Sequence, residues 1–291
     1  MVGLVYGLAA YAFWGIVPIY WKTLHAVPLL EMSAWRIIFS LPFLFVIVLY
    51  MKQLGVVWGI LRRPRMVLIL GLSGLLMLGN WLPFVFLINS GQVMEGSLGY
   101  FLIPLMNAAL GMLVLREKLR IWQGVALAIG AAGVLNQTIA VGALPWLALV
   151  QGASFAVYGI IRKIIPVDAR TGLTIEMILL FPLAAIFLAY LYMSGLGVGP
   201  SLDGFEMAML IVAGPVTVLP LVWFAEAARR IRYITIGLLQ YVAPSGQFLI
   251  AVLLYRESFT LSHAITFGCI WAALAIYSVD SIRAYRERSQ A

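Results

Sequence analysis

The chain has 291 residues, of which 64% are hydrophobic and only 10% are charged. A soluble domain has about 25% charged residues, so this composition excludes a water-soluble fold and indicates that lipid surrounds the protein. The net charge of +8 does not indicate nucleic-acid binding, because the basic residues lie in short groups between apolar segments. The single cysteine, Cys269, cannot form an intramolecular disulfide.

Ten apolar segments follow one another along the chain, each close to the ~20 residues that a helix needs to cross the hydrocarbon core. The first, 2–21, has no leading basic cluster and no small-residue cleavage site, so we interpret it as a retained span. The others are 30–50, 66–88, 95–115, 121–139, 146–163, 172–193, 207–228, 234–255 and 261–280. The sequence therefore predicts an all-α membrane protein with ten transmembrane helices and short connections.

The basic residues predict how the chain is oriented in the membrane. Sixteen of the 19 Lys and Arg residues fall in every second connection or in the C-terminal tail: Lys52, Arg62, Arg63, Arg65, Arg116, Lys118, Arg120, Arg162, Lys163, Arg170, Arg229, Arg230, Arg232, Arg283, Arg286 and Arg288. The opposite side has only Lys22 and Arg256, and Arg36 falls inside a span. Because basic loops stay in the cytoplasm, the pattern predicts a multi-pass protein with both termini cytoplasmic.

The two halves of the chain resemble each other. The segment Gly96-Ser-Leu-Gly-Tyr-Phe-Leu-Ile-Pro104 recurs 140 residues later as Ile236-Gly-Leu-Leu-Gln-Tyr-Val-Ala-Pro244. Each copy runs into an Arg-Glu pair, Arg116-Glu117 in the first and Arg256-Glu257 in the second. Shorter matches join the first span to the sixth and the second to the seventh. The sequence thus predicts two repeats, 1–140 and 141–291, the second ending in a short basic cytoplasmic tail.

Each predicted repeat contains five spans, and this odd number has a topological consequence. The second repeat must enter the membrane from the opposite side, so that the two repeats are inverted with respect to each other. Inverted repeats are typical of secondary transporters, in which a site between the repeats is exposed alternately to the two faces. The repeat therefore predicts transport by alternating access.

Three stretches of sequence resemble a known family. They are Tyr11-Ala-Phe-Trp-Gly15, Ser97-Leu-Gly-Tyr-Phe-Leu-Ile-Pro-Leu-Met-Asn107 and Tyr158-Gly-Ile-Ile-Arg-Lys163. With the five-plus-five arrangement, they resemble the drug/metabolite transporter superfamily, and within it the EamA-type, RarD-like permeases. The resemblance covers nearly the whole chain and implies a bacterial inner-membrane exporter of small metabolites or drugs. It brings no universal binding motif, so it does not identify the substrate.

Arg36 is the clearest candidate for a functional group inside the membrane. An ionisable side chain in the bilayer costs about 2.5–3.5 kcal/mol on insertion scales, so it normally faces the protein interior or a water-filled cavity. Arg36 could be a fixed cation that holds a substrate carboxylate. It could equally be a structural partner of a helix carbonyl or another polar side chain, and the sequence leaves both interpretations open.

Two carboxylates at matched positions, Glu31 and Glu176, lie near the starts of spans 2 and 7. A carboxylate that loses its water holds a proton more tightly, so either residue is a candidate for proton coupling. The alternative is that both cap their helices, where the N-terminal dipole attracts an anion. The sequence favours capping.

Two matched prolines, Pro104 and Pro244, lie inside spans 4 and 9. A proline within a helix removes one hydrogen bond and kinks the chain, so we predict hinges at both positions. Asn107 and Gln247 follow one turn later and are candidates for binding substrate amide or hydroxyl groups. The alternative is a stable kink whose freed carbonyls these side chains satisfy.

The other candidate cavity residues are aromatic or amide side chains: Tyr11, Trp14, Asn80, Trp81, Tyr100, Tyr158, Trp223, Gln240 and Tyr241. Such side chains can surround an amphipathic solute or hold a cation on a ring face. We predict a cavity walled by spans 1, 3, 4, 6, 8 and 9, with spans 5 and 10 peripheral. Trp21 is predicted to belong to the interfacial aromatic belt. The small residues Gly124, Ala128 and Ala132 predict close helix packing within the monomer, with a dimer face as the alternative.

These features together predict a function. Only two histidines occur, His25 and His263, and neither a metal-ligand spacing nor a phosphate-binding loop is present, so we expect no enzyme, metal or cofactor. Nothing resembles the selectivity filter of a channel. We predict a monomeric exporter of small amphipathic metabolites, above all neutral or aromatic amino acids. Hydrophobic, chloramphenicol-like drugs are the alternative substrates, and a non-transporting sensor or scaffold is a weaker alternative.

Overall fold

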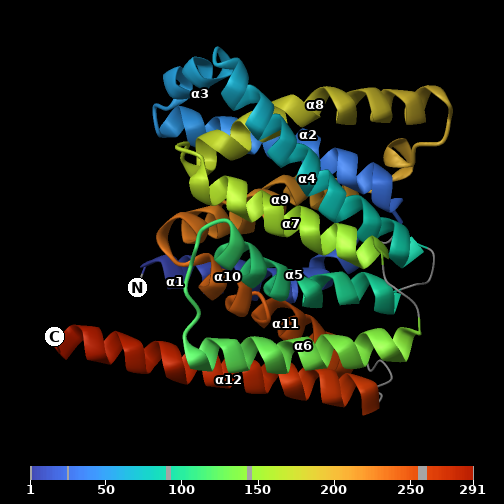
Figure 1. Cartoon of the computed structure of the whole chain (residues 1–291). Coiled ribbons are helices and arrows are strands. Elements are labelled where there is room, and N and C mark those ends of the chain that lie inside the picture. Colours follow the sequence, from blue (N-terminus) through green and yellow to red (C-terminus); the bar gives the residue numbers. More distant parts are fainter. Residues whose placement is uncertain (1, 25, 90–92, 143–145, 255–260, 291) are drawn as a thin grey trace.

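The computed structural model describes the chain except residues 1, 25, 90–92, 143–145, 255–260 and 291. The described residues form helices joined by short turns, without a β-strand among them (Figure 1). The helices are α1 Val2–Lys22, α2 Leu29–Tyr50, α3 Leu54–Leu61, α4 Pro64–Asn89, α5 Val93–Leu113, α6 Ile121–Val141, α7 Trp146–Ile164, α8 Ala169–Met193, α9 Gly204–Arg230, α10 Tyr233–Leu239, α11 Val242–Leu249 and α12 Leu261–Gln290. A 3₁₀ turn, η1, covers Gly199–Ser201, and a π-helical turn, η2, covers Ile250–Leu254.

The chain is an all-α membrane protein. Within the described residues, six helices are long and apolar enough to cross a membrane: α1, α2, α4, α6, α8 and α9. Every predicted segment coincides with a helix, except that the segment 234–255 is divided into α10, α11 and η2. The short helix α3 was not predicted, because its eight residues are too few for a spanning segment.

Pro244 accounts for the division between α10 and α11. A proline has no N–H group, and its ring excludes the carbonyl four residues earlier, which here belongs to Gln240. The helix instead tightens, and the N–H of Ala243 donates to the Gln240 carbonyl oxygen at 3.2 Å. Pro104 lies at the matched position, yet α5 continues through it. Pro244 therefore interrupts its helix, whereas Pro104 does not.

At one edge of the bundle, α6 and α12 pack against each other, and they contact the remainder mainly through α5 and α10 (Figure 1). Gly130 of α6 faces Tyr241, and Gly133 approaches Thr266 and Cys269 of α12. The predicted packing role of Gly124, Ala128 and Ala132 is wrong. Ala128 and Ala132 are exposed, and no atom lies within 4 Å of a Cβ built on Gly124. These three residues lie on the outer face of α6.

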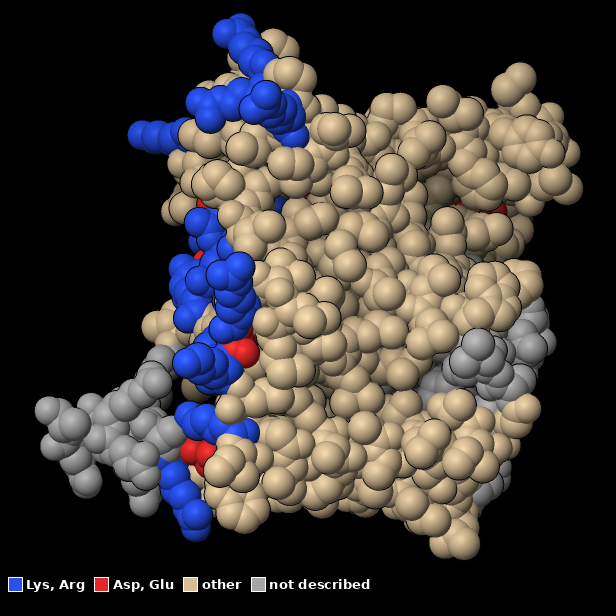
Figure 2. All heavy atoms as spheres, viewed as in Figure 1, with Lys and Arg blue, Asp and Glu red and all other residues tan. Residues whose placement is uncertain are grey.

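The basic residues gather along one end of the bundle (Figure 2). At this end α2, α5, α7 and α9 finish, and Lys52, Arg116, Lys163 and Arg230 lie at or just beyond their last turns. Both chain ends lie there as well (Figure 1). We call it the basic end.

Candidate substrate cavity

A cavity of about 110 Å³ lies between α1, α2, α4, α5, α7, α9 and the α10–α11 segment. One water needs about 10–15 Å³ of such space, so the cavity holds roughly eight waters or one small solute. Its wall includes Trp21, the last residue but one of α1, and Arg36 in the second turn of α2. The cavity therefore extends from the middle of the bundle toward the end opposite the basic end.

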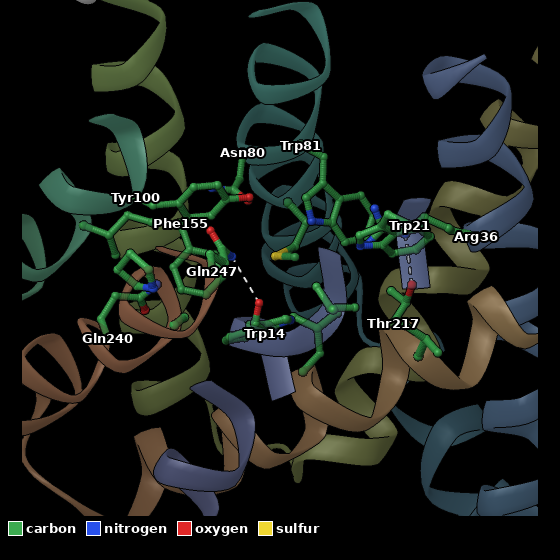
Figure 3. Close-up of a pocket in the computed structure, with 17 residues that line it drawn as sticks. Trp14, Trp21, Arg36, Asn80, Trp81, Tyr100, Phe155, Thr217, Gln240 and Gln247 are labelled. Carbon is green, nitrogen blue, oxygen red and sulfur yellow. Dashed lines mark hydrogen bonds between the residues drawn. The ribbon is translucent and has the colours of Figure 1, made fainter. Parts of the chain in front are cut away.

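Several residues predicted to line a cavity do so: Trp14, Arg36, Asn80, Trp81, Tyr100, Gln240 and Gln247, joined by the hinge candidate Pro244. They come from α1, α2, α4, α5 and the α10–α11 segment, and Figure 3 shows the labelled side chains directed toward a common space. The wall also contains Phe155, and residues that were not predicted to line it, among them Trp21 and Thr217.

Arg36 lies between two indole rings in the wall of this cavity. Its Cζ atom is 4.5 Å from the ring centroid of Trp21 and 4.3 Å from that of Trp81. Its Nε donates a hydrogen bond to Thr217 Oγ1 at 3.0 Å. Among the described residues, no carboxylate forms an ion pair with Arg36. The guanidinium is thus held by ring faces and one hydroxyl, with no negative partner in the described part of the chain.

The prediction that Trp21 belongs to an interfacial belt is wrong. Trp21 follows Trp14 by seven residues, which places both on the same face of α1. That spacing is the signal that could have assigned Trp21 to the cavity. No comparable signal marks Thr217, a small hydroxyl residue in an otherwise apolar helix.

The amide side chains of the wall differ in their hydrogen bonding. Asn80 Nδ2 donates to the carbonyl oxygen of Gln151 at 3.0 Å, and Gln247 Nε2 donates to that of Trp14 at 3.1 Å. Gln240 is only 2% exposed, and its Oε1 atom has no hydrogen-bond partner among the described residues. Figure 3 shows Gln240 and Arg36 on opposite sides of the cavity, with Trp14, Phe155 and Gln247 between them.

Aromatic side chains close the cavity on the side of the basic end. Tyr11, Tyr158, Phe224 and Tyr233 each lie on a cavity helix, displaced from its lining residues toward the basic end. The ring of Phe224 lies 6.3 Å from that of Tyr11 and 6.0 Å from that of Tyr158, and the Tyr233 hydroxyl donates to the Ala156 carbonyl oxygen at 2.5 Å. We call these four residues the aromatic plug. Tyr11 and Tyr158, predicted to line the cavity, are buried in the plug instead.

Three further residues predicted to line the cavity lie elsewhere. Asn107 is buried beside Gly237, where α5 and α10 pack closely. The ring of Trp223 packs against Phe13 with 5.9 Å between centroids. Tyr241 lies in the contact between α10 and α6. All three positions serve helix packing.

Glu31 and Glu176 do not line the cavity, and the prediction that both cap their own helices is wrong. Glu31 accepts hydrogen bonds from the Tyr192 hydroxyl at 2.7 Å and from the N–H groups of Val198 and Gly199 at 3.0 and 3.2 Å. It therefore holds the connection between α8 and α9. Glu176 lies two turns inside α8 and is paired with Arg162 at 3.3 Å.

The Arg-Glu pair that recurs in the two halves has a structural role in its first copy. Glu117 accepts hydrogen bonds from the N–H groups of Tyr233 and Ile234 at 2.8 and 3.0 Å, and so caps the start of α10 at the basic end. The second copy, Arg256-Glu257, lies outside the described residues.

An apolar helical bundle that encloses a polar cavity is the architecture of a membrane solute carrier. Residues 1–136 match the model of the EamA-like transporter family. The chain is 42% identical to an uncharacterized transporter of Vibrio cholerae, over 97% of this chain and 93% of that protein. It is 40% identical to the protein RarD of Escherichia coli K12, over 99% and 97% of the two chains.

One further relative and one solved structure also resemble this chain. The chloramphenicol-sensitive protein RarD of Pseudomonas aeruginosa is 30% identical, over 99% of this chain and 97% of that protein. A protein of known crystal structure shares the fold, with a TM-score of 0.71 over 97% and 98% of the two chains and 18% sequence identity.

The chain belongs to the RarD group of EamA-type transporters in the drug/metabolite transporter superfamily. It is a multi-pass membrane transporter of the bacterial inner membrane.

Proposed function

We propose that this transporter exports small amphipathic carboxylates, with neutral and aromatic amino acids as the leading class. The observation that carries the proposal is Arg36, a cation in the cavity wall with no carboxylate partner among the described residues. Because a charge inside the bilayer is costly, a substrate carboxylate that pairs with Arg36 gains a strong, charge-assisted interaction. The indole and phenyl rings of Trp14, Trp21, Trp81 and Phe155 surround the apolar part of such a molecule.

A neutral hydrophobic drug is the second candidate, since a relative is named for its sensitivity to chloramphenicol. An uncharged ligand would fill the aromatic part of the cavity, but it would leave Arg36 without a counter-charge. The position of Arg36 therefore favours the carboxylate.

We propose a transport cycle based on two inverted repeats. The starts of α5 and α10, Val93 and Tyr233, are separated by the same 140 residues as the repeated sequences. The excess of Lys and Arg assigns the basic end, with both termini, to the cytoplasm. In that orientation the aromatic plug closes the cytoplasmic side of the cavity, and the cavity is that of an outward-facing conformation. Loading from the cytoplasm requires the plug to open.

Replacing Arg36 with Gln should weaken the binding of phenylalanine about 10- to 100-fold, because a hydrogen bond to a charged group contributes about 1.5–3 kcal/mol. The measurement is equilibrium binding to the purified protein in lipid nanodiscs, followed by counterflow in liposomes. Arg283→Gln is the matched control, because Arg283 is exposed at the basic end and should not affect binding. Unchanged binding in Arg36→Gln, or binding of chloramphenicol without any amino acid by the parent, would contradict the proposal.

We also propose that α5 and the α10–α11 segment move at Pro104 and Pro244 when the cavity changes sides. Both prolines remove one helical hydrogen bond, and both are buried in the bundle. Restoring the bond with Pro104→Ala or Pro244→Ala should lower the transport rate more than the substrate affinity, since gating and not binding is impaired.

The control for the hinges is Pro182→Ala, because Pro182 lies exposed within α8 and away from the cavity. Transport rates and affinities are measured for all three variants. If the variants at Pro104 and Pro244 transport at the rate of the parent, the prolines only shape the packing and the hinge proposal is wrong.

A further inference from the structure

The cavity offers two different polar groups on opposite sides. On one side is the Arg36 guanidinium, and on the other is the amide of Gln240 (Figure 3). A buried acceptor without a partner costs about 1–3 kcal/mol. The buried Gln240 Oε1 has no partner among the described residues, so a ligand that donates a hydrogen bond to it regains that free energy.

The chain fixes the Gln240 side chain in this position. Gln240 is the C-cap residue of α10, directly after Leu239, and the ring of Pro244 excludes a regular helical bond to its carbonyl. In the alignment of the two repeats, Gln240 occupies the position of Tyr100, and both residues line the cavity. The amide is therefore part of the substrate wall and not of the lipid-facing surface.

Between the two groups, the cavity wall includes two aromatic rings as well as Gln247. Trp14 and Phe155 lie between Arg36 and Gln240 in Figure 3, and their rings meet nearly edge to face, 5.8 Å apart at an angle of 78°. Rings in this arrangement favour a further ring beside them. The carboxylate and ammonium groups of an α-amino acid are attached to the same carbon atom, so in such a molecule only the side chain extends away from Arg36 across the cavity.

The charge of the cavity wall bears on the α-amino group. Among the described residues that line the cavity, none is Asp or Glu. An ammonium group beside the substrate carboxylate would therefore lie near Arg36 with no negative side chain from the described wall to balance it. The described wall therefore offers the carboxylate a full opposite charge, and it offers an ammonium only ring faces and amide oxygens.

We infer that the preferred substrate is an aromatic carboxylic acid with a hydroxyl at the far end of its ring. Its carboxylate pairs with Arg36, its ring lies beside Trp14 and Phe155, and its hydroxyl donates to Oε1 of Gln240. A hydroxyl both donates and accepts, so it satisfies the amide in either orientation. An α-amino group is not required. This inference rests on the proposed export of amphipathic carboxylates, and within that class it ranks hydroxylated aromatic acids at least equal to the amino acids.

The test compares two acids in two proteins. The ligands are 3-(4-hydroxyphenyl)propionate and 3-phenylpropionate, which differ only in the hydroxyl, and the proteins are the parent and Gln240→Met in nanodiscs. The parent should bind the hydroxylated acid about three- to tenfold more tightly, the effect of one net hydrogen bond. In Gln240→Met this preference should disappear. Tyrosine should bind the parent no more tightly than the hydroxylated acid.

Gln247→Met is the matched control, because Gln247 also lines the cavity but already donates to the Trp14 carbonyl oxygen. It should change the affinity for both acids by the same factor. If Gln240→Met fails to fold, as judged by its size-exclusion profile, Gln240→Leu takes its place.

Two outcomes would overturn the inference: a parent that does not distinguish the two acids, or a preference that persists without the Gln240 amide. If both acids then still depend on Arg36, the proposed function stands and only the inference fails. If neither acid nor any amino acid binds, while chloramphenicol does, both fail.

Discussion

Glu176→Gln should destabilise the protein by about 3–5 kcal/mol, the cost of leaving one member of a buried ion pair without its partner. Glu176 and Arg162 are both fully buried, with 3.3 Å between Oε1 and Nη1. The hydroxyl of Ser73 also donates to Glu176 Oε1 at 2.7 Å, and Arg162 Nη2 donates to the Ala169 carbonyl oxygen at 2.9 Å. The pair thus joins α4, α7 and α8, and a neutral glutamine would leave the guanidinium buried without a counter-charge.

The measurement is thermal or denaturant unfolding of the purified variant in detergent. Glu206→Gln is the control, because Glu206 is only half-buried at the start of α9 and a glutamine can replace it in the capping box. Its effect should stay within about 0.5 kcal/mol. The double variant Arg162→Met with Glu176→Met should recover much of the lost stability, since it removes both charges. A stability of Glu176→Gln equal to that of Glu206→Gln would show that the pair contributes nothing.

Gly214→Ala should destabilise the protein by about 1–3 kcal/mol, because the helices α2 and α9 are too close to admit another methyl group. A Cβ atom at Gly214 would overlap the carbonyl group of Phe39 and approach the backbone nitrogen of Ser40. The two helices would have to separate. Thr217, three residues further along α9, would then move away from Arg36, so substrate affinity should fall together with stability.

The control for this substitution is Gly124→Ala, because a Cβ at Gly124 meets no atom within 4 Å. Alanine is the better helix former, so this variant should be as stable as the parent or more stable by up to ~1 kcal/mol. Unfolding and phenylalanine binding are measured on both variants. If Gly214→Ala matches Gly124→Ala in both measurements, the close approach of α2 and α9 does not constrain the site.

The sequence was sufficient to predict the helices, because membrane-spanning segments are recognised by a local property, their apolar length. It was less informative about which face of each helix points inward. A helix that contacts lipid on one side and protein on the other is apolar on both, so no amphipathic pattern separates the faces. This is why Tyr11, Asn107 and Tyr241 were predicted to line the cavity and instead serve packing.

Tyr100 and Gln240 occupy matched positions in the two halves, and both line the cavity. The partners of Glu31 and Glu176 lie far away in the sequence, on the α8–α9 connection and on α4 and α7, and no local pattern indicates them. Helix capping was therefore the natural but wrong interpretation.

The charge of Arg36 has an electrical consequence for the proposed cycle. Without a substrate, the cavity carries one positive charge; with a bound monocarboxylate, it is neutral. A membrane potential of 100 mV acts on one elementary charge with about 2.3 kcal/mol. A potential that is negative inside therefore favours the cytoplasm-facing conformation of the empty protein. It does not affect the conformational equilibrium of the protein with a bound monocarboxylate. For a monocarboxylate without an ammonium group, each turn of the proposed cycle would move one negative charge outward, so the membrane voltage would favour export; a zwitterionic amino acid would leave the cavity with one positive charge and would move no net charge.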